Sequence, residues 1–250
     1  MGTAASDDLN VKLSDYEALS FDCYGTLIDW EAGIAAVLAP WAATHGLTIG
    51  RDALLERYAA AEARLEVETP TALYPQILGE AMRSLGLALG IDAGAEEREK
   101  LAASVPDWPA FPDSQSALRA LAERYKLVIL SNVDRRSFAA SNARLGVNFD
   151  AIITAQDVGS YKPDVRNFEA LMRTVRLLGV ADGRLLHVAQ SLFHDHVPAR
   201  GLGLPTVWID RRGERAGWGA TPPPGAAVTP DWTFPSMAAF AAACAAPQRD

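Results

Sequence analysis

Leu127-Val128-Ile129-Leu130 begins a regular alternation of short apolar runs with longer segments of helical spacing. Further apolar runs of strand length occupy residues 151–153, 185–189 and 206–209. Helices are predicted over the segments around these runs, 114–124, 137–145, 167–178 and 196–202. Strands that alternate with helices indicate right-handed crossovers, and therefore a parallel sheet covered by helices on both faces.

An earlier apolar run, Glu17–Phe21, predicts a first buried strand that ends in the loop Asp22-Cys23-Tyr24-Gly25-Thr26. From about residue 30 to 101 the composition changes to Ala, Leu, Glu and Arg with helical spacing. We predict an α/β fold with a doubly wound, Rossmann-like core of residues 15–30 and 103–250. A small helical cap, residues 31–102, is inserted after the first strand. Residues 211–235, rich in Gly and Pro, are predicted to form a surface loop, and 236–246 a final helix.

Composition narrows the class of partner. The 250 residues are 49% hydrophobic and 22% charged, so the chain can bury a sizeable core. The net charge is −8 and no run of Lys or Arg occurs, which argues against a nucleic acid or an anionic membrane and favours a small molecule. An apolar cap surface is compatible with a homodimer.

Two features favour a cytoplasmic protein. Cys23 and Cys244 are the only cysteines, too few for a disulfide framework and without the paired spacing of a zinc site. The segment Met1–Asp8 is polar and acidic, unlike a signal peptide. We therefore expect a location in the reducing cytoplasm.

Polar residues follow four of the predicted strands. Ligands of open α/β sheets bind beyond the carboxyl ends of the strands, so these residues are the candidates for a site. They are Asp22 after the first strand, Ser131 and Asn132 after the second, Lys162 after the third, and Gln190, Ser191 and Asp195 after the fourth.

Together these segments resemble the haloacid dehalogenase (HAD) superfamily, and most closely its type II 2-haloacid dehalogenase branch. The resemblance covers residues 21 to about 212. It is carried by Phe21-Asp22-Cys23-Tyr24-Gly25-Thr26-Leu27, by Leu130-Ser131-Asn132, by Ser160-Tyr161-Lys162-Pro163-Asp164, and by His187-Val188-Ala189-Gln190-Ser191 with Asp195 beyond it. The first and third of these motifs are the specific ones.

The resemblance implies roles for five residues. Asp22 is the expected nucleophile, and Lys162 is a fixed positive charge near it. Thr26 and Ser131 are expected to support the Asp22 carboxylate and the bound substrate. Asn132 is implied as a polar contact, although Asn at such a position could instead cap the following helix.

The resemblance also bears on the reaction. Phosphatases of this superfamily carry a second Asp two residues after the nucleophile and an acid in the last motif that holds Mg²⁺; here these positions are Tyr24 and Gln190. A site without those two carboxylates should bind Mg²⁺ poorly. A halide leaves as a stable anion and needs no general acid. We therefore expect metal-independent, cofactor-free hydrolysis of a small 2-haloacid through an aspartyl ester.

Two points stay open at this stage. Water could be activated by Asp195, His194 or His196. The dehalogenase branch carries a cap Arg for the substrate carboxylate, but the register here can place Leu55 at that position, with Arg57 or Arg64 as substitutes. We expect Asp22, Thr26, Ser131, Lys162 and Asp195 to be catalytic, and the substrate to be bound by Cys23, Tyr24, Arg57, Asn132, Gln190 and Ser191.

Other interpretations compete with these assignments. Cys23 could simply pack in the core, and Trp41, Tyr58 and Tyr74 could line a pocket under the cap or pack within it. A phosphatase that holds Mg²⁺ through Asp22 and Asp195 alone is the first alternative function. A catalytically silent protein that keeps this fold for binding is the second.

Overall fold

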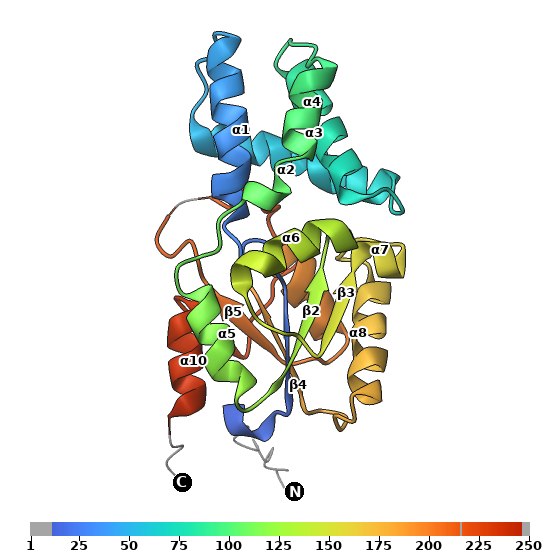
Figure 1. Cartoon of the computed structure of the whole chain (residues 1–250), viewed down its shortest axis with the longest axis vertical. Coiled ribbons are helices and arrows are strands. Elements are labelled where there is room, and N and C mark those ends of the chain that lie inside the picture. The colour runs from blue at the N-terminus through green and yellow to red at the C-terminus, as the bar shows by residue number, and fades with distance from the viewer. Residues whose placement is uncertain (1–11, 216, 247–250) are drawn as a thin grey trace, which may run out of the picture.

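The computed structural model describes residues 12–215 and 217–246. Six parallel strands form one sheet in the order β3-β2-β1-β4-β5-β6, and the first five along the chain are those that the sequence alternation predicts (Figure 1). The order reverses at β1, which pairs with β2 on one side and β4 on the other. Such a reversal opens a crevice beyond the carboxyl ends of these strands. The segment Met1–Asp8 lies outside the described residues.

The strands are short, and the two at the centre of the sheet, β1 and β4, are buried along their whole length. The strands are β1 (Ala18–Phe21), β2 (Lys126–Ser131), β3 (Ala151–Thr154), β4 (Leu185–Ala189), β5 (Thr206–Ile209) and β6 (Trp232–Phe234). The core helices are α5 (Ser114–Ala122), α6 (Arg135–Leu145), α7 (Ala155–Val158), α8 (Val165–Leu177), α9 (Val197–Gly201) and α10 (Met237–Ala245). A π-helical turn, Leu192–His196, leads into α9.

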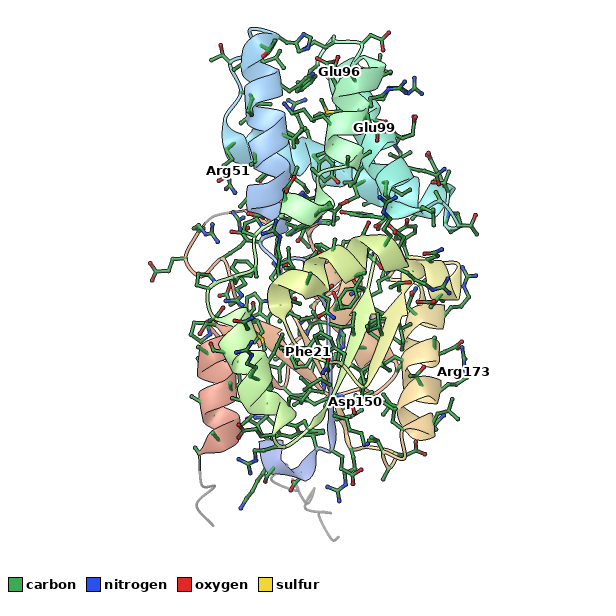
Figure 2. The ribbon with its side chains drawn as sticks, in the orientation of Figure 1. Phe21, Arg51, Glu96, Glu99, Asp150 and Arg173 are labelled. Carbon is green, nitrogen blue, oxygen red and sulfur yellow. The ribbon has the colours of Figure 1, made fainter. Side chains whose placement is uncertain are left out.

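Each face of the sheet packs against its own set of helices because side chains alternate along a strand. Leu19, Phe21 and Ile129 belong to an apolar cluster that includes α5, α6 and α10. Val128 and Leu130, from the other face, pack with Phe168 and Leu171 of α8 and with α9. Figure 2 shows Phe21 inside the core and Arg173 projecting outward from α8.

Four helices form a layer above the carboxyl ends of the strands, and we call this layer the cap (Figure 1). They are α1 (Trp30–Thr44), α2 (Arg51–Glu68), α3 (Tyr74–Ala88) and α4 (Ala95–Ala102). The cap and the core are in close contact at Gly33 of α1, which packs against the ring of Trp108. A Cβ added at Gly33 would lie only 2.2 Å from that ring. The cap therefore sits over the edge of the sheet at which the predicted site residues follow their strands.

The structure adds two elements that the sequence analysis did not predict. Strand β6 lies within residues 211–235, which were predicted to be a loop, and pairs with β5 through Val207 and Trp232. This prediction was wrong because a three-residue strand carries almost no periodic signal, although pairing with a neighbour stabilises it. The short helix α7 follows β3 directly and is capped by Thr154.

Within the described residues, no helix is long and apolar enough to cross a membrane.

Candidate active site

Asp22 follows β1 directly, and its two carboxylate oxygens have different partners. The Thr26 hydroxyl donates to Oδ2 at 2.7 Å, and Lys162 Nζ donates to Oδ1 at 2.9 Å. The loop can turn this tightly because Gly25 has φ +91°, a conformation that residues with a Cβ rarely adopt. Thr26 Oγ1 also accepts from the backbone N–H of Gln190, so one hydroxyl ties β1 to the loop after β4.

Lys162 is 1% exposed, and its ammonium group donates three hydrogen bonds. The acceptors are Asp22 Oδ1, Asp195 Oδ1 at 2.6 Å and the Leu130 carbonyl at 3.1 Å. Burial alone would lower the pKa of Lys162, but the charges of Asp195 and Asp22 raise it above its ordinary value. Lys162 is thus a permanent cation between two carboxylates.

The two carboxylates respond differently to this cation. Burial raises the pKa of Asp22, and the charge and hydrogen bond of Lys162 oppose that rise. Burial would also raise the pKa of Asp195, but Lys162 and His187 hold it below its usual range. His187 Nε2 lies 3.0 Å from Asp195 Oδ1, and His187 Nδ1 lies 2.8 Å from the Ser20 hydroxyl. Asp195 therefore keeps its negative charge.

Asn132 fixes the backbone that carries Lys162. Its Oδ1 accepts from the Lys162 N–H at 2.6 Å, and its Nδ2 donates to the Lys162 carbonyl at 3.0 Å. It is not the cap of α6, because Asp134 accepts from the first N–H groups of that helix. Its amide also reaches across to the carboxylate of Glu66 on α2 at 3.3–3.4 Å.

Two glutamates of α2 complete the cavity, and the sequence analysis did not find them. Glu62 and Glu66 are 4% and 6% exposed. Tyr58 and Tyr74 donate to Glu62 Oε1 at 2.7 and 2.8 Å. A usable signal exists: positions 54, 58, 62 and 66 are spaced by four, so the glutamates share the helix face of Leu54 and Tyr58.

A cavity of about 40 Å³ lies between the core and the cap. Of the predicted residues, Asp22, Tyr24, Asn132, Lys162, Ser191 and Asp195 line it. Trp30, Glu62, Glu66, Tyr74, His194 and Thr221 line the remainder. Tyr74 therefore faces the site, whereas Trp41 is buried within the cap. Thr26 and Ser131 are buried beside it, and within the described residues the Ser131 hydroxyl has no hydrogen-bond partner.

Three predicted substrate-binding residues are not brought to this cavity. Arg57 is exposed on α2; nine positions separate it from Glu66, and at about 100° per residue this places the two on opposite sides of the helix. Cys23 belongs to the apolar core, which is the packing interpretation. Gln190 lines a separate cavity with Arg211 and Arg212. Arg64, the other arginine considered, is also exposed and pairs with Glu68.

The candidates for water activation are also separated. His194 and Asp195 line the cavity, whereas His196 Nε2 donates to the Ala189 carbonyl at 3.0 Å. Burial lowers the pKa of both His194 and His196 to about 4, so both rings are neutral at neutral pH. Asp195 Oδ2 is buried and has no hydrogen-bond partner among the described residues.

The residues present do not fit the Mg²⁺ ion of the phosphatases in this superfamily. The Lys162 ammonium donates to both Asp22 and Asp195, so a cation already lies between the two carboxylates a metal would need. Tyr24 stands where a further acid would be, and its hydroxyl lies 2.7 Å from the Ser141 hydroxyl. This chemistry favours a reaction driven by a carboxylate and a fixed ammonium group.

Comparison with known proteins finds 2-haloacid dehalogenases. The chain is 29% identical over 243 residues to an (S)-2-haloacid dehalogenase of Pseudomonas sp. strain YL, covering 90% of this chain and 93% of that protein. The crystal structure of the defluorinating L-2-haloacid dehalogenase Rha0230 superposes with a TM-score of 0.72 at 25% identity, covering 92% of this chain and 96% of that one.

A second solved structure is the L-2-haloacid dehalogenase of Xanthobacter autotrophicus with chloropropionic acid covalently bound. It gives a TM-score of 0.72 at 20% identity and covers 91% of this chain and 97% of that one. The family model for haloacid dehalogenase-like hydrolases matches residues 16–188, which include Asp22, Asn132 and Lys162. The chain therefore belongs to the haloacid dehalogenase-like hydrolase family.

Proposed function

We propose that the protein hydrolyses the carbon–halogen bond of a small 2-haloacid through an ester on Asp22. The observation that carries this proposal is the setting of Asp22, which faces the cavity, is held by Lys162 and Thr26, and has Tyr24 in place of a second acid. The names of the relatives support the same substrate class.

In the first step, a carboxylate oxygen of Asp22 attacks the substrate carbon that bears the halogen. The halide departs with the bonding electrons, so no group has to protonate it. Lys162 and Thr26 hold the carboxylate in place before the attack, which reduces the entropy lost in reaching the transition state. The covalent chloropropionic acid of the Xanthobacter relative supports an intermediate of this kind.

In the second step, water attacks the carboxyl carbon of the Asp22 ester. The attack returns a carboxylate on Asp22, and the product keeps the original Asp22 oxygen as its hydroxyl. We assign the activation of this water to Asp195, which lines the cavity, stays ionised and has an Oδ2 without a partner among the described residues. The proton that Asp195 takes from the water passes to the departing ester oxygen, which becomes the hydroxyl of the product. Lys162 stabilises the oxyanion that develops on the ester.

The proposal includes a division into a core of residues 15–30 and 103–250 and a cap of residues 31–102. The grouping of α1–α4 above the sheet supports it (Figure 1). It also includes a cytoplasmic location, supported by the two cysteines, both free thiols.

Isotope labelling tests the proposal. In a single turnover of 2-chloropropionate in H₂¹⁸O, the label should enter Asp22 and the released 2-hydroxy acid should stay unlabelled. Asp22→Asn should lower halide release by at least about 10³-fold, because the amide is a poor nucleophile. Asp182→Asn, a change at an exposed residue, serves as the control. Label found first in the product would mean that water attacks the substrate directly and would refute the ester mechanism.

A further inference from the structure

The cap side of the cavity carries two acidic residues, although a haloacid substrate would bring a further carboxylate into the same space. Glu62 and Glu66 lie one turn apart on α2 and line the same cavity as Asp22. Lys162 is the only Lys or Arg among the lining residues, and its ammonium already serves two carboxylates and a carbonyl. A substrate carboxylate therefore needs a different donor.

The hydrogen bonds of the two glutamates decide which of them stays ionised. Glu62 accepts from two phenol hydroxyls at 2.7 and 2.8 Å, which stabilise its charged form. Among the described residues, Glu66 accepts only from the Asn132 amide at 3.3–3.4 Å, a weak contact. Burial raises the pKa of Glu62 to about 7 and that of Glu66 well above its usual range, where the charge of Glu62 adds to the effect. When one of the two glutamates is protonated, it is therefore Glu66.

A buried polar atom without a partner lies near Glu66. His194 Nε2 is buried without a hydrogen-bond partner among the described residues and lies 3.9 Å from Glu66 Oε2, too far for a direct hydrogen bond. The fully buried Asp195 also lines this cavity, and its Oδ2 has no partner among the described residues. Polar atoms left without partners on two residues that line the cavity indicate a site built to receive a polar ligand.

A second cavity, of about 240 Å³, adjoins Glu66 from the outside. It shares Glu66, Lys162 and His194 with the first cavity and reaches the exposed residues Val67 and Arg166. Glu66 therefore borders a second cavity whose lining residues include neither Asp22 nor Asp195.

We propose that Glu66, as a neutral carboxylic acid, donates a hydrogen bond to the carboxylate of the substrate in place of a cationic side chain. The inference rests on the proposed function, and it makes Glu66 a specificity-determining residue. No bond is broken: the Glu66 O–H points to a substrate oxygen, and the proton stays between the two groups. An ionised Glu66 would instead repel the substrate.

The groups that face Glu66 fit this role. Glu62, Tyr58 and Tyr74 surround it within the cap. From the core, Lys162, Tyr161 and His194 face it, while Asp22 and Asp195 lie in the same cavity. Of these, only Lys162 favours ionisation of Glu66 by its charge, and Asp22 and Asp195 partly neutralise that cation.

The test asks whether substitutions of Glu66 weaken or tighten the binding of propionate, an unreactive analogue. Binding is measured by calorimetry at pH 7. Glu66→Gln keeps a neutral N–H donor and should bind within threefold of the wild type. Glu66→Leu removes the donor and should bind at least tenfold more weakly. An ionised Glu66 would give the reverse, because both substitutions would then tighten binding; equal or tighter binding by Glu66→Leu would overturn the inference.

Three comparisons complete the experiment. Glu68→Gln, an exposed change on the same helix, should leave propionate affinity unchanged. Circular dichroism of each variant checks that the cap is folded. Halide release from 2-chloropropionate is measured separately, because propionate binding needs no turnover. No halide release together with the expected binding order would refute only the proposed function, whereas halide release with the reverse order would refute only the role of Glu66.

Discussion

The two walls of the cavity hold their charges in different ways. On the core wall, both oxygens of Asp22 have partners at 2.7 and 2.9 Å, and Lys162 has three acceptors. On the cap wall, Glu66 has one weak amide contact among the described residues. The core wall thus holds its reacting carboxylate in place, whereas the cap wall leaves the Glu66 carboxyl group weakly held.

The largest expected effect comes from breaking the core wall at Lys162. Lys162→Met leaves Asp22 and Asp195 buried without their cation, which should destabilise the fold by about 3–5 kcal/mol and slow halide release by at least about 10³-fold. Urea unfolding and halide release measure the two effects. Lys100→Met, at an exposed lysine of α4, is the matched control.

Adding Asp195→Asn to Lys162→Met should restore part of the stability, because one of the two unpaired charges is removed. It should not restore activity. If Lys162→Met alone kept both stability and turnover, the description of the core wall as a charge network would be wrong.

The next largest effect concerns the cap wall and is measured as the pH dependence of the unfolding free energy. The pKa of Glu62 rises from 4.5 to about 7 on folding, so the folded state favours its protonated form. The resulting stability is fully present below pH 4.5 and is lost as the pH rises through 7, by up to about 3 kcal/mol. The unfolding free energy of the wild type relative to Glu62→Gln should therefore fall between pH 5 and pH 8.

Glu62→Gln should show a flatter pH dependence, and Glu68→Gln, exposed on the same helix, should follow the wild type. A wild type that gained stability relative to Glu62→Gln over this range would mean that the two tyrosines lower the pKa of Glu62 more than burial raises it.

These two walls also differ in how far they could be predicted from the sequence. Asp22, Asn132, Lys162 and Asp195 follow strand ends, and parallel strands bring their carboxyl ends to one edge, so topology alone places them together. The cap residues have no such constraint. A glutamate on a helix ordinarily faces solvent, and only the packing of α2 onto the core buries Glu62 and Glu66.

Gly25 offers a smaller test of how tightly the core wall is held. Its φ of +91° disfavours any Cβ, and a Cβ there would lie 2.9 Å from the Gln190 side-chain oxygen. Gly25→Ala should cost about 1–3 kcal/mol of stability and reduce halide release about tenfold, because the loop that carries Thr26 must shift.

Gly90→Ala is the matched control for this change. Its φ is +78°, and nothing lies within 4 Å of the added Cβ, so it should lose stability with little change in halide release. Equal losses of activity in both variants would mean that the loop of Asp22 tolerates displacement and that the core wall is less rigid than its contacts indicate.

The smallest expected effect is at Arg57, and it tests which face of α2 meets the substrate. The sequence analysis named this arginine as a substrate-binding residue and, with Arg64, as a substitute for the cap Arg of the branch, yet its side of α2 faces away from Glu66 and the cavity. Arg57→Ala should therefore change the KM for 2-chloropropionate by less than twofold, with kcat unaltered. Arg64→Ala is the parallel variant, since Arg64 is also exposed.

A tenfold rise in KM for Arg57→Ala alone would require α2 to rotate by about half a turn when substrate binds, because nine positions at about 100° each separate Arg57 from the face that carries Glu66. Such a rotation would expose Leu54 and Tyr58, whose burial opposes it, so an unchanged KM is the outcome that the packing of the cap predicts.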